Sequence, residues 1–244
     1  MLHTKYPHER DNNIKFEEKG HIYTINESRG YTSVTTWIKK FFKKFDADKI
    51  INNMMKSANW STSKYFGMTK EEIKLLWNNN GDNAAKLGTD MHKMFEDYYN
   101  GINVNGTGVE FEYFQNFIND NTHLVPFRSE WLIYDEDLKL SGSVDMLFIN
   151  EDGTLSIYDW KRCKSLEKFV SYNQFALEPI SNIPDTNFWH YSIQLNTYKL
   201  IIERKYGYKV KDMYLICIHP DLDTNYQKHE VLPMDMSVLI KDNK

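Results

Sequence analysis

The sequence predicts an α/β or α+β fold in which helices cover the faces of one sheet. Two observations lead to this class. Three β segments, separated by turn residues at 135–137 and 150–153, occupy residues 128–162. Helical patterns with apolar stripes precede and follow these segments, and a further strand pattern covers residues 212–219. This order of helices, antiparallel meander, helix and strand is typical of a single sheet packed between helices.

The N-terminal region is expected to combine a hairpin with helices. Residues 16–25 alternate apolar and polar side chains around a Lys-Gly pair, a pattern typical of a β-hairpin. Thr32 or Ser33 is a candidate N-cap for the aromatic helical pattern that follows. Thr69 and Glu72 have the spacing of a capping box, which predicts the start of another helix.

Two further helices are expected before the β segments and one after them. A helical pattern over 83–100 ends at Gly101, and a second covers 109–120. A third covers 188–206, and a last short strand is expected near 228–233. The apolar stripe of the helix over 83–100 consists of Leu87, Met91, Met94, Phe95 and Tyr98.

Length and composition indicate one globular domain. At 244 residues and 29.1 kDa, the chain is expected to be a single domain over 1–244, made of an N-terminal hairpin and helical region (1–82), a core (83–220) and a C-terminal strand and tail (221–244). No apolar run reaches the roughly 18 to 20 residues of a membrane-spanning helix, so no membrane partner is expected. The polar start lacks the apolar core of a secretory signal. We therefore expect an intracellular protein, without distinguishing a cytoplasmic, nuclear, organellar or viral location.

The cysteine count and the net charge exclude some classes of protein. Cys163 and Cys217 are too few for a disulfide framework, and we expect ordinary buried or half-buried thiols. A net charge of −4 is no global signature of nucleic-acid binding. Positive charge is gathered locally at 37–45, 161–168 and 203–209, and each cluster taken alone is most simply a solvated face. A groove needs only local positive potential, so a phosphate-bearing substrate stays compatible with this charge.

Two aspartates and a lysine interrupt the apolar β segments. Leu155, Ile157, Asp159 and Lys161 share one face of a strand because side chains alternate, and the last two lie about 6 to 7 Å apart along it. Asp145 lies in the preceding strand, and strand pairing can bring its carboxylate near Asp159. Two close carboxylates repel each other unless a cation lies between them, and Mg²⁺ or Mn²⁺ suits such oxygen ligands. The alternative is a surface hairpin with an Asp–Lys ion pair.

Other polar residues extend this candidate site. His92 follows Gly88 by one helical turn, and the small glycine would let the imidazole approach a neighbouring backbone or ligate a metal. Glu130 opens the first β segment and offers another carboxylate. Gln194 and Tyr198 lie one turn apart on the last long helix. Each of these has a simpler interpretation, as a surface histidine, a strand-end acid, or a helix surface and core edge.

Taken in order, these motifs resemble the RecB-type branch of the PD-(D/E)xK nuclease superfamily. The matching segments are a helical G-x-x-x-H at 88–92, a Glu at 130, G-x-x-D at 142–145, D-x-K at 159–161 and a helical Q-x-x-x-Y at 194–198. Val144 stands where the superfamily name has Pro. The four cysteines that hold an iron–sulfur cluster in some relatives are absent, so no cluster is predicted.

Within that branch, the sequence is most similar to the mitochondrial genome maintenance exonuclease group. The segment 21–38, HIYTINESRGYTSVTTWI, resembles the N-terminal signature of that group. The resemblance covers roughly 20–45 and 85–220, most of the chain. It implies a restriction-endonuclease-like core, with a central mixed sheet flanked by helices and a helical N-terminal region.

The resemblance also implies roles for individual residues. The metal ligands, for one or two Mg²⁺ or Mn²⁺ ions, would be His92, Asp145, Asp159 and the backbone carbonyl of Trp160, with Glu130 as a further ligand whose offset varies in the family. Asp145, Asp159 and Lys161 would be catalytic, with Lys161 orienting the attacking water. Residues expected to contact or position nucleic acid are Gln194, Tyr198, Ser33, Trp37, Lys39 and Lys40.

Trp37, Phe41 and Phe42, with the interleaved lysines, are one candidate for an entry platform, because aromatic rings and positive charge suit unpaired bases. The alternative for these aromatic residues is an ordinary core helix.

The function that the resemblance implies is a metal-dependent DNA nuclease, most consistent with an exonuclease on single-stranded DNA in replication, repair or recombination. Its expected partners are DNA and proteins of replication or recombination; the sequence does not give the oligomeric state. Two alternatives stay open: an endonuclease on DNA or RNA with the same site, and a catalytically silent nucleic-acid-binding protein on a nuclease fold. The second would be expected to have lost an acid or the lysine, and here none is missing.

Overall fold

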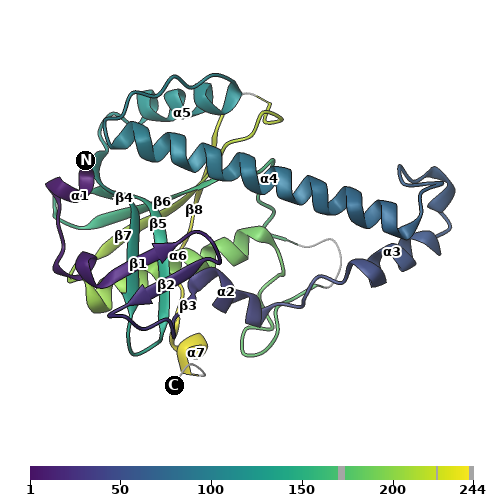
Figure 1. The fold of residues 1–244 in the computed structure, drawn as a ribbon, viewed down its shortest axis with the longest axis horizontal. Helices are drawn as coiled ribbons and strands as arrows, with labels where there is room; N and C mark the ends of the chain where they lie inside the picture. Colours follow the sequence, from purple (N-terminus) through teal and green to yellow (C-terminus); the bar gives the residue numbers. More distant parts are fainter. Residues whose placement is uncertain (170–173, 224, 242–244) are drawn as a thin grey trace.

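A mixed sheet of six strands forms the centre of the computed structural model, which describes residues 1–169, 174–223 and 225–241 (Figure 1). The strands run in the order β3-β5-β6-β7-β8, and β4 pairs with β5. The β4–β5, β5–β6 and β7–β8 pairs are antiparallel, whereas β3–β5 and β6–β7 are parallel. The strands are β3 (Thr32–Ser33), β4 (Val125–Asp135), β5 (Leu140–Ile149), β6 (Leu155–Lys161), β7 (Val210–Cys217) and β8 (Gln227–Glu230). The predicted α/β class with a mixed central sheet flanked by helices is confirmed.

Helices lie on both faces of this sheet. On one face, Trp160 of β6 contacts Phe95 of α4 (Lys70–Tyr99) at a centroid distance of 5.3 Å and Phe117 of α5 (Val109–Asp120) at 5.1 Å. On the other face, the ammonium of the next residue, Lys161, lies 4.6 Å from the ring centroid of Tyr191 in α6 (Asn187–Lys205). Because consecutive strand residues point to opposite faces, β6 contributes its apolar side to one helical layer and its charged side to the other.

The shorter elements surround this core. The predicted N-terminal hairpin forms from β1 (Ile14–Glu17) and β2 (Ile22–Ile25), and its turn includes Gly20 at φ +92°. Ser33 caps α2 (Val34–Ile38), since its Oγ accepts a hydrogen bond of 3.1 Å from the backbone N–H of Thr36. The remaining elements are α1 (Leu2–Lys5), η1 (Glu9–Asn13), η2 (Lys39–Phe41), α3 (Ala47–Met55), η3 (Trp60–Thr62) and α7 (Ser237–Ile240).

The helix expected over 83–100 is longer in the structure. It begins at Lys70 behind the predicted capping box, in which Thr69 and Glu72 each bond to the other's backbone N–H. The helix passes through Gly81 without a break and ends at Tyr99. In its middle, 79–87, every residue is exposed, so no buried apolar stripe runs through this stretch. The predicted stripe is therefore wrong at Leu87 and also at Tyr98, which is exposed, whereas Met91 and Phe95 are buried.

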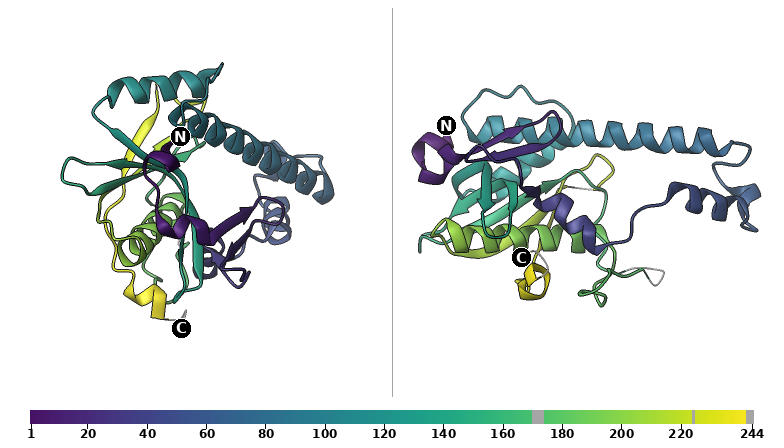
Figure 2. Two further views of the ribbon diagram at one scale, coloured as in Figure 1. Left: turned by 60° about the vertical axis from the view of Figure 1, so that its left-hand side comes forward. Right: turned by 60° about the horizontal axis from the view of Figure 1, so that its bottom comes forward.

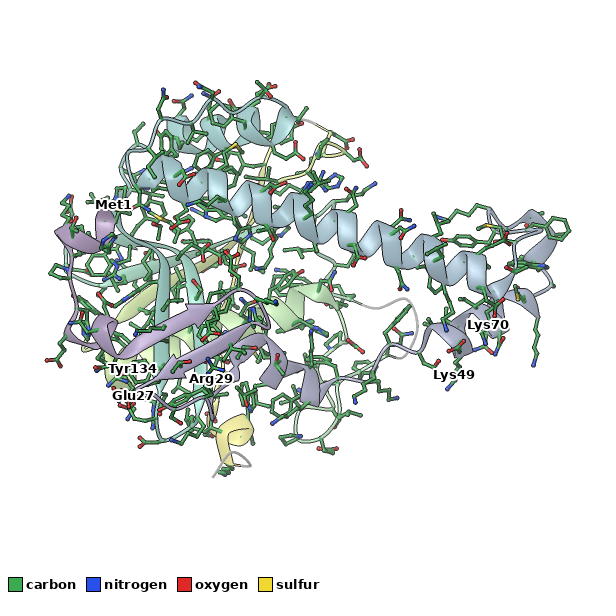
Figure 3. The ribbon with its side chains drawn as sticks, viewed as in Figure 1. Met1, Glu27, Arg29, Lys49, Lys70 and Tyr134 are labelled. Atoms are coloured by element: carbon green, nitrogen blue, oxygen red, sulfur yellow. The ribbon has the colours of Figure 1, made fainter. Side chains whose placement is uncertain are left out.

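Helix α3 and the N-terminal part of α4 form an arm that projects away from the sheet (Figures 1 and 2). We call residues 43–80 the arm. Lys49 of α3 and Lys70 of α4 lie near each other on the arm (Figure 3), where Asp48 pairs with both Lys70 and Lys74. Seven lysines and four acidic residues give the arm a formal charge of +3, so the rest of the chain carries −7 of the total of −4.

Among the described residues, no helix combines the length and the apolar character that crossing a bilayer requires. The end of the tail, 242–244, lies outside the described residues.

Candidate functional site

A cleft of about 780 Å³ opens between the N-terminal hairpin and α4. The hairpin contributes Phe16 and Tyr23 to one wall, and α4 contributes His92 to the other. Glu130 of β4 and Ser143 of β5 also line the cleft. The cleft therefore joins three segments that are far apart in the sequence.

His92, Glu130 and Asp145 form a compact group at this cleft. One ligand atom of each residue lies within 4.8 Å of a ligand atom of each of the other two. In the part of the chain that the structure describes, this is the one group of three or more His, Cys, Asp or Glu residues with such spacing. Nδ1 of His92 is 3.5 Å from Oδ2 of Asp145 and 3.6 Å from Oε1 of Glu130. An imidazole and two carboxylates are suitable ligands for a divalent cation.

Strand pairing explains why the two carboxylates meet. Ser129 pairs with Met146 and Trp131 pairs with Val144, so Glu130 lies directly opposite Asp145 across β4 and β5. The backbone of Glu130 has φ +44°, an unusual value for a residue other than glycine. Ser143 Oγ donates a hydrogen bond of 2.7 Å to Oε2 of Glu130, which holds the carboxylate in place.

Asp145 lies where β5 and β6 separate. The two strands pair from Ile149↔Leu155 to Met146↔Tyr158. Beyond this point, a hydrogen bond from the β6 backbone to the Asp145 side chain takes the place of backbone–backbone pairing. Its Oδ2 accepts a hydrogen bond of 2.9 Å from the backbone N–H of Trp160. The carbonyl of the same residue lies 2.9 Å from Nε2 of His92. Both polar backbone groups of Trp160 therefore position the cluster, while its indole is anchored in the aromatic core.

Asp159 and Lys161 lie beside this cluster. Asp159 is 1% exposed, and one of its oxygens, Oδ2, forms an ion pair with Nζ of Lys161. Oδ1 is buried and has no hydrogen-bond partner among the described residues. A buried carboxylate oxygen without a partner is costly. Oδ1 of Asp159 is therefore free to act as a ligand for a cation.

The charges of the site shift one another's pKa values. Burial alone would lower the pKa of His92, but the Asp145 and Glu130 carboxylates outweigh it and raise that pKa to about 9. Burial raises the pKa of Asp145, against the opposing effect of His92 and Lys161. Burial and the Asp145 charge raise the pKa of Asp159 to about 7. Around neutral pH the imidazolium of His92 and the ammonium of Lys161 are the cations that offset these acids.

Gln194 and Tyr198 lie on α6 and are both buried, at 7% and 2% exposure. Gln194 Nε2 donates a hydrogen bond of 3.0 Å to the Tyr198 hydroxyl. The Tyr198 ring packs directly on Gly142, where an added Cβ would lie 2.6 Å from Cε1 of the ring. The glycine of one predicted motif is thus the contact site for the tyrosine of another. We expect this pair to hold α6 against β5.

Replacing Gly142 with alanine should destabilise the fold by about 1–3 kcal/mol, because the new methyl group overlaps the Tyr198 ring. Gly88→Ala is the matched control. An added Cβ at Gly88 meets nothing within 4 Å, and this glycine lies inside α4, so alanine should stabilise the fold by up to ~1 kcal/mol. Urea unfolding of both variants measures the two signs. Equal stability of the two variants would contradict the close packing at Gly142.

The structure also places the residues predicted to contact nucleic acid. Lys39 and Lys40 are exposed, and Ser33 is the buried N-cap of α2. Trp37 is 1% exposed and packs edge-on against Phe41 in the core. The core alternative therefore holds for this segment, because a ring buried by its neighbours has no face free to stack on a base.

Sequence reasoning missed two residues of the site. Ser143 positions Glu130, and its place beside Asp145 in the motif at 142–145 was the available signal. The ring of Tyr191, under the Lys161 ammonium, lies one turn before Gln194 on α6. Its spacing from Gln194 and Tyr198 could have indicated a shared helix face.

Comparison with known proteins gives distant structural similarity only. No protein-family model and no curated protein matches the sequence. The fold is similar to the crystal structure of SSO0001, with a TM-score of 0.39 and 13% identity over 88% of this chain and 73% of that one. It is also similar to a protein from Eubacterium rectale named "Putative exonuclease", with a TM-score of 0.34 and 13% identity over 88% of this chain and 76% of that one.

Proposed function

We propose that the protein is a metal-dependent nuclease of the PD-(D/E)xK type, and that it hydrolyses phosphodiester bonds of single-stranded DNA as an exonuclease. One observation carries this proposal: His92, Glu130, Asp145, Asp159 and Lys161 converge from α4 and three neighbouring strands, and His92 and Glu130 of this group line the cleft. A chance surface hairpin would not draw a histidine and a glutamate from other elements to the same two aspartates.

The donor set fits a hard divalent cation. Glu130 and Asp145 offer carboxylate oxygens, Nδ1 of His92 faces both, and the unpartnered Oδ1 of Asp159 is nearby in the same charge cluster. These residues, with the Trp160 carbonyl as a further candidate, would hold Mg²⁺ or Mn²⁺. When bound, such an ion supplies Lewis acidity, lowering the pKa of water and polarising a phosphate oxygen.

The remaining residues have roles that follow from their own contacts. Burial alone would lower the pKa of Lys161, but Asp159 and Asp145 outweigh it and raise that pKa. Its ammonium therefore stays cationic and is suited to orient a water and to stabilise charge that develops on the phosphate. Ser143 fixes Glu130, and Trp160 fixes Asp145 and His92, so the site is largely preorganised.

The surface of the arm favours a nucleic-acid partner that has unpaired bases. Phe45 and Phe66 are 71% and 59% exposed on the arm, among its lysines. Exposed rings next to positive charge favour stacking of unpaired bases together with attraction of phosphates. This surface takes the place of the buried Trp37 as the candidate stacking surface.

Replacing both Phe45 and Phe66 with alanine should weaken binding of a single-stranded oligonucleotide about 10-fold or more, because each lost stacking contact is worth roughly 1–3 kcal/mol. Fluorescence anisotropy with a labelled DNA strand, at fixed salt and without divalent ions, measures the affinity. Leu232→Ala is the control, since this apolar residue is 68% exposed but lies outside the arm. Unchanged affinity in the double variant would exclude the arm as a stacking surface.

Digestion of a substrate panel tests the proposed activity. The panel contains 5′-labelled and 3′-labelled single strands, the matching duplex, an RNA of the same sequence and a single-stranded circle, each with Mg²⁺, with Mn²⁺ or with chelator. We expect short products from the linear DNA strands with Mn²⁺ and an intact circle. A cut circle would contradict an exonuclease, and faster cleavage of RNA would contradict DNA as the substrate. A panel untouched with either Mg²⁺ or Mn²⁺ would contradict nuclease activity itself.

A further inference from the structure

The two cysteines of the chain meet beside Lys161, although 54 positions separate them in the sequence. Cys217 is the last residue of β7, and its register partner on the parallel strand β6 is Lys161. Cys163 follows two residues after β6 ends. The two Sγ atoms are 3.0 Å apart, closer than two sulfur atoms in simple contact.

The two thiols differ in exposure and in acidity. Cys163 is half-buried, whereas Cys217 is fully buried. The hydrogen bond with Cys217 lowers the pKa of Cys163, and the nearby Lys161 ammonium acts in the same direction. The same hydrogen bond and burial raise the pKa of Cys217. Cys163 is therefore the more accessible and more nucleophilic sulfur, with Cys217 as the proton donor beside it.

The surroundings do not suit a soft metal ion. A structural zinc site needs four ligands. Among the residues described, the one group of His, Cys, Asp or Glu residues close enough to share an ion is His92, Glu130 and Asp145, which does not include either cysteine. The two thiols have no further metal ligands nearby, and the short distance between their sulfur atoms instead suits formation of a disulfide when an oxidant is present.

We propose that Cys163 and Cys217 are a redox modification site that closes to an intramolecular disulfide in the presence of hydrogen peroxide. The Cys163 thiolate attacks one oxygen of the peroxide, forming a sulfenic acid and releasing hydroxide. Sγ of Cys217 then attacks Sγ of Cys163, the S–O bond breaks, and the Cys217 proton leaves with the hydroxyl group as water. Together the two thiols lose two electrons and two protons, and the peroxide becomes two molecules of water.

The bond would link parts of the fold that support the candidate site. The carbonyl of Lys161 already accepts hydrogen bonds from the backbone N–H of Cys163 at 3.0 Å and of Ile218 at 2.9 Å. Closing the sulfur atoms to a bond length of about 2.05 Å moves them by only about 1 Å. The closed loop contains the whole of α6, so the disulfide would tie β6 to β7 behind Lys161 and restrict this half of the site. This inference does not depend on the proposed nuclease activity.

Thiol counting and peptide mapping test the proposal on the full chain. After mild peroxide treatment under native conditions, we expect the denatured protein to have lost both free thiols and to yield a Cys163–Cys217 peptide from a monomer. Dithiothreitol should restore both thiols. The oxidised protein should unfold at a temperature several degrees higher than the reduced one. Unlinked sulfinic or sulfonic cysteines, linked dimers, or two unreacted thiols would each overturn the proposal.

Two single variants test the order of attack. In Cys217→Ala, the sulfenic acid of Cys163 has no partner, so dimedone should label this residue. In Cys163→Ser, the buried Cys217 should resist peroxide and keep its thiol. Dimedone labelling of Cys217 with Cys163 unreactive would contradict Cys163 as the first sulfur. Melting curves of the reduced variants confirm that each one folds.

Discussion

Lys161→Ala is expected to lower divalent-ion-dependent DNA cleavage about 10²- to 10³-fold, the loss typical of removing one preorganised donor to developing charge. The ammonium of Lys161 is the cationic side chain paired with the buried Asp159, and it lies over the ring of Tyr191. Alanine removes the group proposed to orient the attacking water, while the proposed ligands His92, Glu130 and Asp145 stay in place. Single-turnover rates on a labelled DNA strand with Mn²⁺ measure the loss.

A matched lysine serves as the control. Lys164 lies three residues further along, is 66% exposed and pairs with Asp221 at the surface, so Lys164→Ala should cleave like the wild type. Because Lys161→Ala leaves the buried Asp159 without its cation, Lys161→Met provides a second variant that keeps the packing of the aliphatic stem. Thermal melting of all three variants separates a lost group from a lost fold. Folded Lys161 variants with wild-type rates would contradict the proposed role.

The strands of the candidate site could be predicted because the relevant signals are local. Side-chain alternation placed Asp159 and Lys161 on one face of a strand, and the structure shows the same face continuing from buried Leu155 and Ile157. The capping box at Thr69 and Glu72 likewise depends on residues three apart, and it forms as expected. Such short-range patterns carry their own geometry.

The features that the sequence did not predict depend on long-range contacts. The sequence named Glu130 as a further carboxylate of the site, but not its contact with Asp145. That contact depends on the register of β4 on β5, and a shift of one residue would place the carboxylate on the other face. Cys163 meets Cys217 through the parallel pairing of β6 and β7, which requires α6 to cross over first. The burial of Trp37 depends on tertiary packing that a helical pattern alone does not specify. In each case the missing information was which strand or helix lies next to which.

The fusion of two expected helical segments into α4 has a different cause. Polar residues and Gly81 between 78 and 83 read as a break, but one interior glycine costs a helix only about 1 kcal/mol relative to alanine. The capped start at Thr69 and the buried contacts of Ile73 and Phe95 at either end offset this cost. Local propensity therefore gave way to stabilisation at the two ends of the helix.

Mn²⁺ affinity should rise about tenfold for each pH unit between pH 7.5 and 9 and level off above pH 9, because His92 must lose its proton before it can ligate a metal. In the metal-free protein, the imidazolium between Asp145 and Glu130 acts as the local cation, and an incoming ion has to displace its proton. The Asp159 carboxyl, with a pKa of about 7, is already largely ionised in this range. Isothermal titration calorimetry in two buffers of different ionisation enthalpy should therefore detect about one proton released per ion near pH 8.

The stability of the metal-free fold should have the opposite dependence on pH. The pKa of His92 is raised from 6.5 to about 9, so its ion pairs stabilise the fold fully below pH 6.5, and this contribution is lost as pH rises through 9. Melting temperatures of the metal-free protein should fall over this window, and added Mn²⁺ should restore them at high pH. In His92→Asn, both pH dependences should be flattened, because an amide does not titrate here. His21→Asn, a change in the same cleft but outside the cluster, should leave both slopes as in the wild type. A pH-independent Mn²⁺ affinity in the wild type would show that His92 is not a ligand.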